Sequence, residues 1–435
     1  MKKIIAILLS LTLLVSIVGV LAGCQEKGTA EGGKLLVGYG RADVTPDDPV
    51  PLGGYNNDLQ RVSTTVRDPI YATCIAVTAE DGTSILMYSV DIGRMTGTEL
   101  AKARKVLSKE LGLPVQNIIE SCTHNHFGPS PTLSEDDHPA LGPWNDKLEK
   151  GMVQAGRDAW NDRKEATLQY SSIEVTGLNA VRHYIMDDGS VDAGAGSGTG
   201  TTYVSQVKEA DKQMQVVLFR REEGKDIVMV NFQAHPQEYY WEGLGGMDTT
   251  LTADTPGATR DFVEKQLDCN FVYFSGASGN LNTRSYIESE NVHDNLQEYG
   301  EKLGRYVVLA LEEMEELKVD AVRVLKKEIP YKEGKSAMQV DVFQLGELGF
   351  ASVPYEMFDT SGQFIKENSP YKATFILYLA NGSGTYIPAE YAYNFEGGYE
   401  VGAGYPKGAA EELANGYVSM LEELHAGVTG GQNNG

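Results

Sequence analysis

The amino-acid sequence predicts an α/β protein in which mixed parallel and antiparallel sheets are flanked by helices. Short apolar runs with the composition of strands alternate with amphipathic helical runs, and two of the strands are joined by a short polar turn. The chain has 435 residues, of which 41% are hydrophobic and 23% charged, so it can bury a large core. Because no Pro/Ser-rich or charged linker divides the body, we predict one large domain of the catalytic type.

The elements of the first half indicate both kinds of strand pairing. A strand over residues 84–90, a helix over 97–111 and a strand over 117–122 follow one another, which is typical of an α/β or mixed-sheet domain. Two later runs, 214–219 and 227–232, flank a polar turn and predict a hairpin. Antiparallel strands must therefore coexist with parallel ones.

The second half repeats this alternation of helices and strands. We predict, in order, a helix over 255–267, a strand over 271–274, a long amphipathic helix over 295–317, strands near 322–329, 340–343, 350–353 and 374–379, and a final helix near 408–425. The Gly-rich stretch 193–202 lacks a GxGxxG pattern followed by a helix, so we interpret it as a surface loop and not as a phosphate-binding loop.

The first 23 residues form a targeting segment. Lys2 and Lys3 precede an apolar run that closes on Leu-Ala-Gly before Cys24, which resembles a bacterial lipoprotein signal peptide. That resemblance implies cleavage before Cys24, lipidation of its thiol, and a location on the extracytoplasmic face of the cell membrane. The alternative is an uncleaved transmembrane anchor. Residues 24–34 are expected to form a tether.

Composition limits the partners of the remaining chain, which we divide into a body over 35–426 and a disordered tail over 427–435. Lys and Arg number 37 and Asp and Glu 61, which gives a net charge of -24 that repels nucleic acid. Four cysteines, one of them assigned to lipidation, do not suggest a disulfide framework. The expected partners are a small-molecule or lipid substrate and, through the anchor, the membrane.

Candidate metal ligands follow four predicted strands. His124 and His126 lie two residues apart after the first strand pair, so in extended backbone both address one side; His235, Glu356 and Tyr386 each follow a later strand. Residues beyond the carboxyl ends of strands converge in open sheets. Two imidazoles and a carboxylate form a typical catalytic zinc site, although each residue taken alone is compatible with a structural role.

Five motifs carry a resemblance to the neutral/alkaline ceramidase family. They occur in the family's order and cover nearly all of the chain after Leu35: THNHFGP at 123–129, NFQAHP at 231–236, TADTPG at 252–257, GASGNLN at 276–282 and NGSGTYIP at 381–388. In that family a zinc ion activates water to cleave the amide between a fatty acid and sphingosine. The resemblance implies Zn²⁺ as cofactor and a single ceramidase-like catalytic domain.

The resemblance also implies roles for particular residues. By position, its zinc ligands are His124, His235, Glu356 and Tyr386. His126 corresponds to a histidine beside the metal that faces the substrate and can pass a proton to the leaving group. Arg182, in VRHYIMDDG at 181–189, corresponds to an arginine that faces the substrate. In the mechanism we expect, zinc together with Arg182 or Tyr386 stabilises the oxyanion.

One position departs from the family pattern. The ceramidases carry a serine, proposed as nucleophile, where this sequence has Asn282, which can hydrogen-bond water or substrate but cannot attack. Ser278 is a poor substitute because its surroundings miss the G-x-S-x-G pattern. We therefore expect a zinc hydrolase that cleaves an N-acyl lipid such as ceramide, or a related acyl amide, by metal-activated water. The alternatives are a metallohydrolase for another ester or amide, and a non-catalytic lipid-anchored binding protein on the same fold.

Overall fold

The structure, a computed structural model, describes residues 35–95, 97–130, 132–192, 201–332, 334, 336–395 and 398–431. The predicted signal peptide, Cys24, the tether, most of the Gly-rich loop and the last four residues of the predicted tail lie outside these ranges. In the described part of the chain, no helix is both long and apolar enough to cross a membrane.

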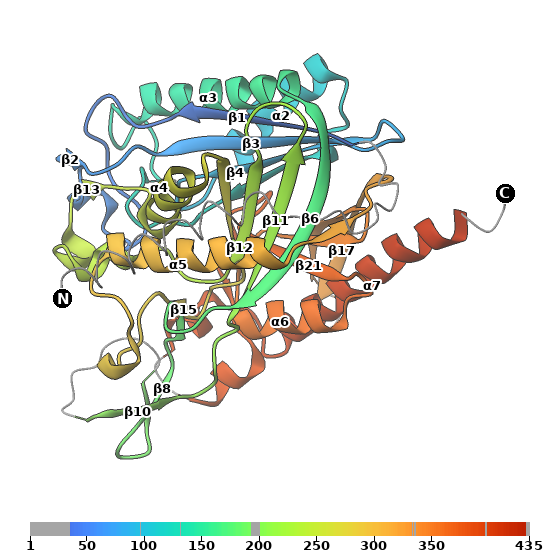
Figure 1. The fold of residues 1–435 in the computed structure, drawn as a ribbon. Helices are drawn as coiled ribbons and strands as arrows, with labels where there is room; N and C mark the ends of the chain where they lie inside the picture. Colours follow the sequence, from blue (N-terminus) through green and yellow to red (C-terminus); the bar gives the residue numbers. More distant parts are fainter. Residues whose placement is uncertain are drawn as a thin grey trace, which may run out of the picture. The chain divides into compact units, whose positions relative to one another are not determined.

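Two sheets form the inner layers of the body (Figure 1). The larger sheet, nine-stranded within the described residues, has the order β14-β12-β11-β6-β1-β3-β4-β5, with β16 paired to β6. Its strands are β1 (Leu35–Asp43), β3 (Tyr71–Thr78), β4 (Ser84–Val90), β5 (Ile118–Cys122), β6 (Lys164–Glu174), β11 (Gln213–Arg221), β12 (Ile227–Phe232), β14 (Asn270–Ser275) and β16 (Glu315–Leu317). The smaller sheet contains β17 (Val322–Tyr331), β18 (Ser336–Leu345), β19 (Leu348–Val353) and β21 (Ala373–Tyr378).

Strand pairing is mixed, which confirms the predicted fold class. The pairs β4–β5, β12–β14 and β19–β21 are parallel. The pairs β1–β3, β11–β12 and β17–β18 are antiparallel, and β11–β12 is the predicted hairpin. A parallel pair requires a crossover between its strands, and the helices supply it.

Helices cover the outer face of each sheet. Successive side chains of a strand point to opposite faces, and both faces are apolar: one packs against the other sheet and one against the helices. In β12, Ile227 and Met229 pack between the sheets with Phe350 and Phe375 of the smaller sheet, whereas Val228 faces the helices. The larger sheet is covered by α2 (Gly97–Leu111), α3 (Leu141–Asn161), α4 (Asp254–Leu267) and α5 (Leu296–Ala310), and the smaller one by α6 (Asp359–Asn368) and α7 (Ala409–Gly431). The body is therefore a helix–sheet–sheet–helix arrangement.

Two predicted boundaries were wrong. The long helix expected over 295–317 ends at Ala310. β16 then pairs antiparallel with residues 168–170 of β6, beyond the residues 164–166 that pair with β1, and Leu317 is buried there. At the C-terminus, α7 continues to Gly431, inside the range expected to be a disordered tail. Extending an existing helix forms one hydrogen bond per added residue, so a packed helix readily continues past its last buried contact.

Candidate metal centre

The two sheets are tied together where the candidate ligands leave them. The Asn231 side chain, at the end of β12, donates to the carbonyls of Phe274 and Ile376 at 3.0 and 2.9 Å. The Asn381 backbone N–H donates to the Glu120 carbonyl at 2.8 Å. These bonds bring the ends of β5, β12, β14 and β21 to one place, so residues far apart in the sequence meet there.

Three buried histidines form the centre of this region. Candidate ligand atoms of His124, His126 and His235 all lie within 4.8 Å of one another, so the cluster could hold a metal ion. The Nε2 atom of His126 lies 2.9 Å from that of His235 and 3.4 Å from that of His124. His124 has a left-handed backbone with φ of 65°, a strained conformation that is found in many functional sites.

Main-chain carbonyls orient two of these imidazoles. His124 Nδ1 lies 2.6 Å from the Gly93 carbonyl, and His235 Nδ1 lies 3.0 Å from the Ser278 carbonyl. Because a carbonyl only accepts, both Nδ1 atoms carry the hydrogen, and in the neutral imidazoles both Nε2 atoms offer a lone pair that a metal ion can take up. This arrangement is typical of metal-binding histidines.

His126 is the third imidazole of the cluster. Its Nδ1 atom is buried and has no hydrogen-bond partner among the described residues. Burial, together with His235 and His124, holds the pKa of His126 well below its usual value, and burial has the same effect on the pKa of His235. Neutral imidazoles are the form that binds metals. The geometry thus makes His126 a candidate ligand as well as the group beside the metal that the resemblance implied.

Glu356 supplies the carboxylate. Its Oε2 atom lies 3.3 Å from His124 Nε2 and 3.4 Å from the Tyr378 hydroxyl, and its Oε1 atom lies 3.1 Å from Arg94 Nη2. Burial opposes ionisation of this group, but His124 and Arg94 lower the pKa of Glu356 to about 2. A charged carboxylate therefore faces the histidines.

Tyr386 is held next to Glu356 by a short pair of strands. β20 (Glu356–Met357) and β22 (Tyr386–Ile387) run parallel, with Glu356 and Tyr386 as register partners. Burial, Glu356 and Tyr399 hold the pKa of the Tyr386 phenol well above its usual value, so the hydroxyl keeps its proton. The structure thus brings the two predicted ligands side by side.

Arg182 lies in a buried ion pair that sequence reasoning missed. Its Nε and Nη2 atoms donate to Glu400 Oε1 at 2.9 and 2.8 Å, and Nη2 also donates to the Gly279 carbonyl at 2.5 Å. Arg182 and His183 lower the pKa of Glu400 to about 2 against the opposing effect of burial. The guanidinium also lies 5.4 Å from the Tyr386 ring centre. These contacts indicate that Arg182 holds Glu400, the Gly279 carbonyl and the Tyr386 ring in place.

Asn282 is connected to the loop that carries His235. It lies in β15 (Leu281–Asn282), which pairs with β7 (Ala180–Val181) next to Arg182. Its Oδ1 atom accepts a hydrogen bond from Gln237 Nε2 at 2.7 Å. Asn282, which stands where the ceramidases carry a serine, is therefore hydrogen-bonded through its side-chain amide to Gln237, two residues after His235.

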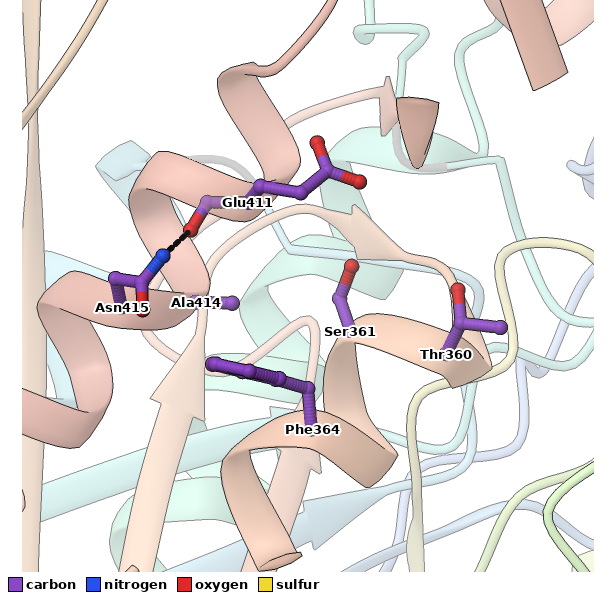
Figure 2. A pocket seen from close by; sticks show the side chains of 6 residues that line it. All are labelled: Thr360, Ser361, Phe364, Glu411, Ala414 and Asn415. Atoms are coloured by element: carbon purple, nitrogen blue, oxygen red, sulfur yellow. Dashed lines mark hydrogen bonds between the residues drawn. The ribbon is translucent and has the colours of Figure 1, made fainter. Parts of the chain in front are cut away.

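A separate hollow lies between α6 and α7 (Figure 2). It has a volume of about 190 Å³ and is lined by Thr360, Ser361, Phe364, Glu411, Ala414 and Asn415. Ligand pockets usually measure about 300–1,000 Å³. None of the candidate site residues lines this hollow, so it does not belong to the metal centre.

Sequence reasoning missed three further residues at or beside the centre, two of which had no usable signal. Tyr378 ends an apolar strand and resembles a core aromatic, and Glu400 lies in a surface-like Gly/Tyr stretch. Arg94 did have a weak signal, because a charged residue interrupts the apolar Ile-Gly-Arg-Met segment directly after β4.

Comparison with solved structures defines the class of fold. A ceramidase determined in complex with C2 superposes with a TM-score of 0.74 at 14% identity, covering 91% of this chain and 76% of that chain. The neutral ceramidase from Pseudomonas aeruginosa superposes with a TM-score of 0.73 at 15% identity, covering 90% and 74%. No protein-family model and no curated protein matches the chain. The chain has the neutral ceramidase fold, and identities this low establish the fold alone.

Proposed function

We propose that this protein is a zinc-dependent amide hydrolase of the neutral ceramidase type. The observation that carries the proposal is the convergence of the three histidines and Glu356 at strand ends in a fold shared with ceramidases. Burying imidazoles and a charged carboxylate costs free energy, and a bound cation would offset this cost beyond the one Glu356 oxygen that Arg94 contacts.

The donor spacing supports zinc. Two ligand atoms of a tetrahedral zinc ion lie roughly 3.3 Å apart, because zinc–ligand distances are about 2.0–2.1 Å. The separation of His124 Nε2 and Glu356 Oε2, two of the proposed ligand atoms, is 3.3 Å. His124, His235 and Glu356 would hold the ion, with Tyr386 close to it or bound. When bound, the zinc ion acts as a Lewis acid: it lowers the pKa of the attacking water and polarises the scissile carbonyl of the substrate.

The chain's own residues supply proton transfer and orientation. His126 faces the proposed ligands through its Nε2 atom, 2.9 Å from His235 Nε2, and would carry the proton to the leaving amine. The protonated Tyr386 hydroxyl would donate to the oxyanion. Arg182, fixed by Glu400, would hold Tyr386 and the segment before Asn282 in place. No side-chain nucleophile is required.

Hydrolysis of a short-chain ceramide by the zinc-loaded protein tests this function. We expect release of fatty acid that a chelator abolishes and zinc restores, and a loss of at least about 100-fold in His124→Ala. The control His425→Ala, on α7, should retain activity. If zinc is bound but no acyl amide or ester in a panel is cleaved, the proposal is wrong and a binding protein on this fold becomes the better account.

We also propose that the protein is anchored to the extracytoplasmic face of the cell membrane through lipid on Cys24. The support is the basic, apolar and Leu-Ala-Gly-Cys pattern of the first 24 residues. Cys24→Ala should abolish incorporation of a labelled fatty acid and block processing before residue 24. Unchanged labelling in that variant would contradict the anchor.

A further inference from the structure

Arg94 lies on the outer side of the candidate metal centre. It follows Gly93, whose carbonyl orients His124. Its Nη2 atom contacts Glu356 Oε1 at 3.1 Å, while the other oxygen of Glu356 faces His124 Nε2 at 3.3 Å. Arg94 is therefore one contact away from the histidines.

Arg94 differs from the other arginines near the cluster in its exposure. Its side chain is 28% exposed, whereas the side chain of Arg182 is 4% exposed and Arg61 is fully buried. Arg61 donates to the carbonyls of Asp248, Gly53 and His126, and Arg182 donates to Glu400 and two carbonyls. Of these three arginine side chains, that of Arg94 is the one open to solvent.

The chemistry of Arg94 suits an anionic group of the substrate. The chain has a net charge of -24, so a partly exposed cation beside its candidate centre provides local attraction against the overall charge. A guanidinium has five N–H donors in a planar fork that pairs with a carboxylate through two parallel bonds.

We propose that Arg94 binds a carboxylate close to the scissile amide, so that the preferred substrates are N-acyl amino acids and not neutral N-acyl amino alcohols. The carboxylate must be close to the reacting bond because Arg94 touches a proposed metal ligand. This inference rests on the proposed function, since it assigns the substrate class of the same site.

Two matched substrates test the proposal on the zinc-loaded full chain. N-decanoylglycine and N-decanoylethanolamine differ only in a carboxylate in place of a hydroxymethyl group. We expect wild type to favour N-decanoylglycine at least about tenfold in kcat/KM. Arg94→Met should lower kcat/KM for N-decanoylglycine at least about tenfold more than kcat/KM for N-decanoylethanolamine, with the additional loss mainly in KM, because any loss through the Glu356 contact is common to both substrates. Arg305→Met, at an exposed position of α5, is the control and should change neither.

Other outcomes overturn the proposal. An equal loss with both substrates at matched zinc content would mean that Arg94 only positions Glu356, and a wild-type preference for N-decanoylethanolamine would exclude carboxylate recognition. If wild type cleaves neither compound, the proposed hydrolase function fails separately. In that case, calorimetry measures the Kd of N-decanoylglycine for wild type and for Arg94→Met. A Kd at least about tenfold higher in the variant supports carboxylate binding by Arg94, and an unchanged Kd rejects it.

Discussion

At the scale of single residues, Gly54 is expected to control the position of His126. Its φ is +117°, and an added Cβ would lie 2.6 Å from His126 Cγ. Gly54→Ala should therefore displace the imidazole and lower hydrolysis at least about tenfold, with a stability loss of roughly 1–3 kcal/mol from backbone strain. Gly82→Ala is a matched control, because Gly82 also has a positive φ but no atom within 4 Å of an added Cβ. Equal losses of activity in the two variants would contradict this role.

A second residue-scale prediction concerns the pH dependence of stability. The folded-state pKa of Glu400, about 2, is below the value of about 4.3 in an unfolded chain. Its contribution to the free energy of unfolding is therefore present above about pH 4.3 and lost as the pH falls through about 2. The difference corresponds to roughly 3 kcal/mol. Urea unfolding of wild type and Glu400→Gln should differ by up to this amount at pH 6, and the difference should shrink towards pH 2.

The control for this measurement is Glu390→Gln, which removes a carboxylate from an exposed pair with Lys407. Exposed pairs contribute about 0–1 kcal/mol, so this variant should follow wild type at every pH. A gap between wild type and Glu400→Gln that stays constant down to pH 2 would mean that the ion pair with Arg182 does not set the pKa of Glu400.

At the scale of elements, the Asn231 side chain joins the two sheets beside the candidate site. Asn231→Ala removes hydrogen bonds to the Phe274 and Ile376 carbonyls and leaves both without that donor. We expect a stability loss of roughly 1–4 kcal/mol in urea unfolding. Asn368→Ala, which removes one exposed bond at the end of α6, should cost less than about 1 kcal/mol. Equal effects would mean that the two sheets are not coupled through Asn231.

The elements also show what the sequence could predict. Hydrophobic periodicity located β4, α2 and the β11–β12 hairpin because each has a regular apolar pattern. It failed for β16, since pairing with β6 is a tertiary contact that local pattern does not record. The positions of His124 and His235 after strand ends predicted their convergence. Tyr378 and Glu400 stayed hidden because their contacts, with Glu356 and Arg182, are seen only in the folded chain.

At the scale of the whole molecule, metal binding should be coupled to folding. A ligand that binds only the folded state stabilises it by about 2.7 kcal/mol at 100 times its Kd. Zinc should therefore raise the unfolding temperature of wild type, and a chelator should reverse the rise. The His124→Ala/His235→Ala double variant should show no zinc-dependent change. A shift of the same size in that variant would place the bound zinc elsewhere on this acidic chain.

The measurement that tests the central claim most directly is the metal content of the purified full chain. The protein is offered zinc, freed of unbound ions and analysed by mass spectrometry, beside the His124→Ala/His235→Ala double variant, with circular dichroism to verify that both are folded. We predict about one zinc per chain in wild type and almost none in the variant. No retained zinc in wild type, or the same amount in both proteins, would contradict a metal centre built on these histidines.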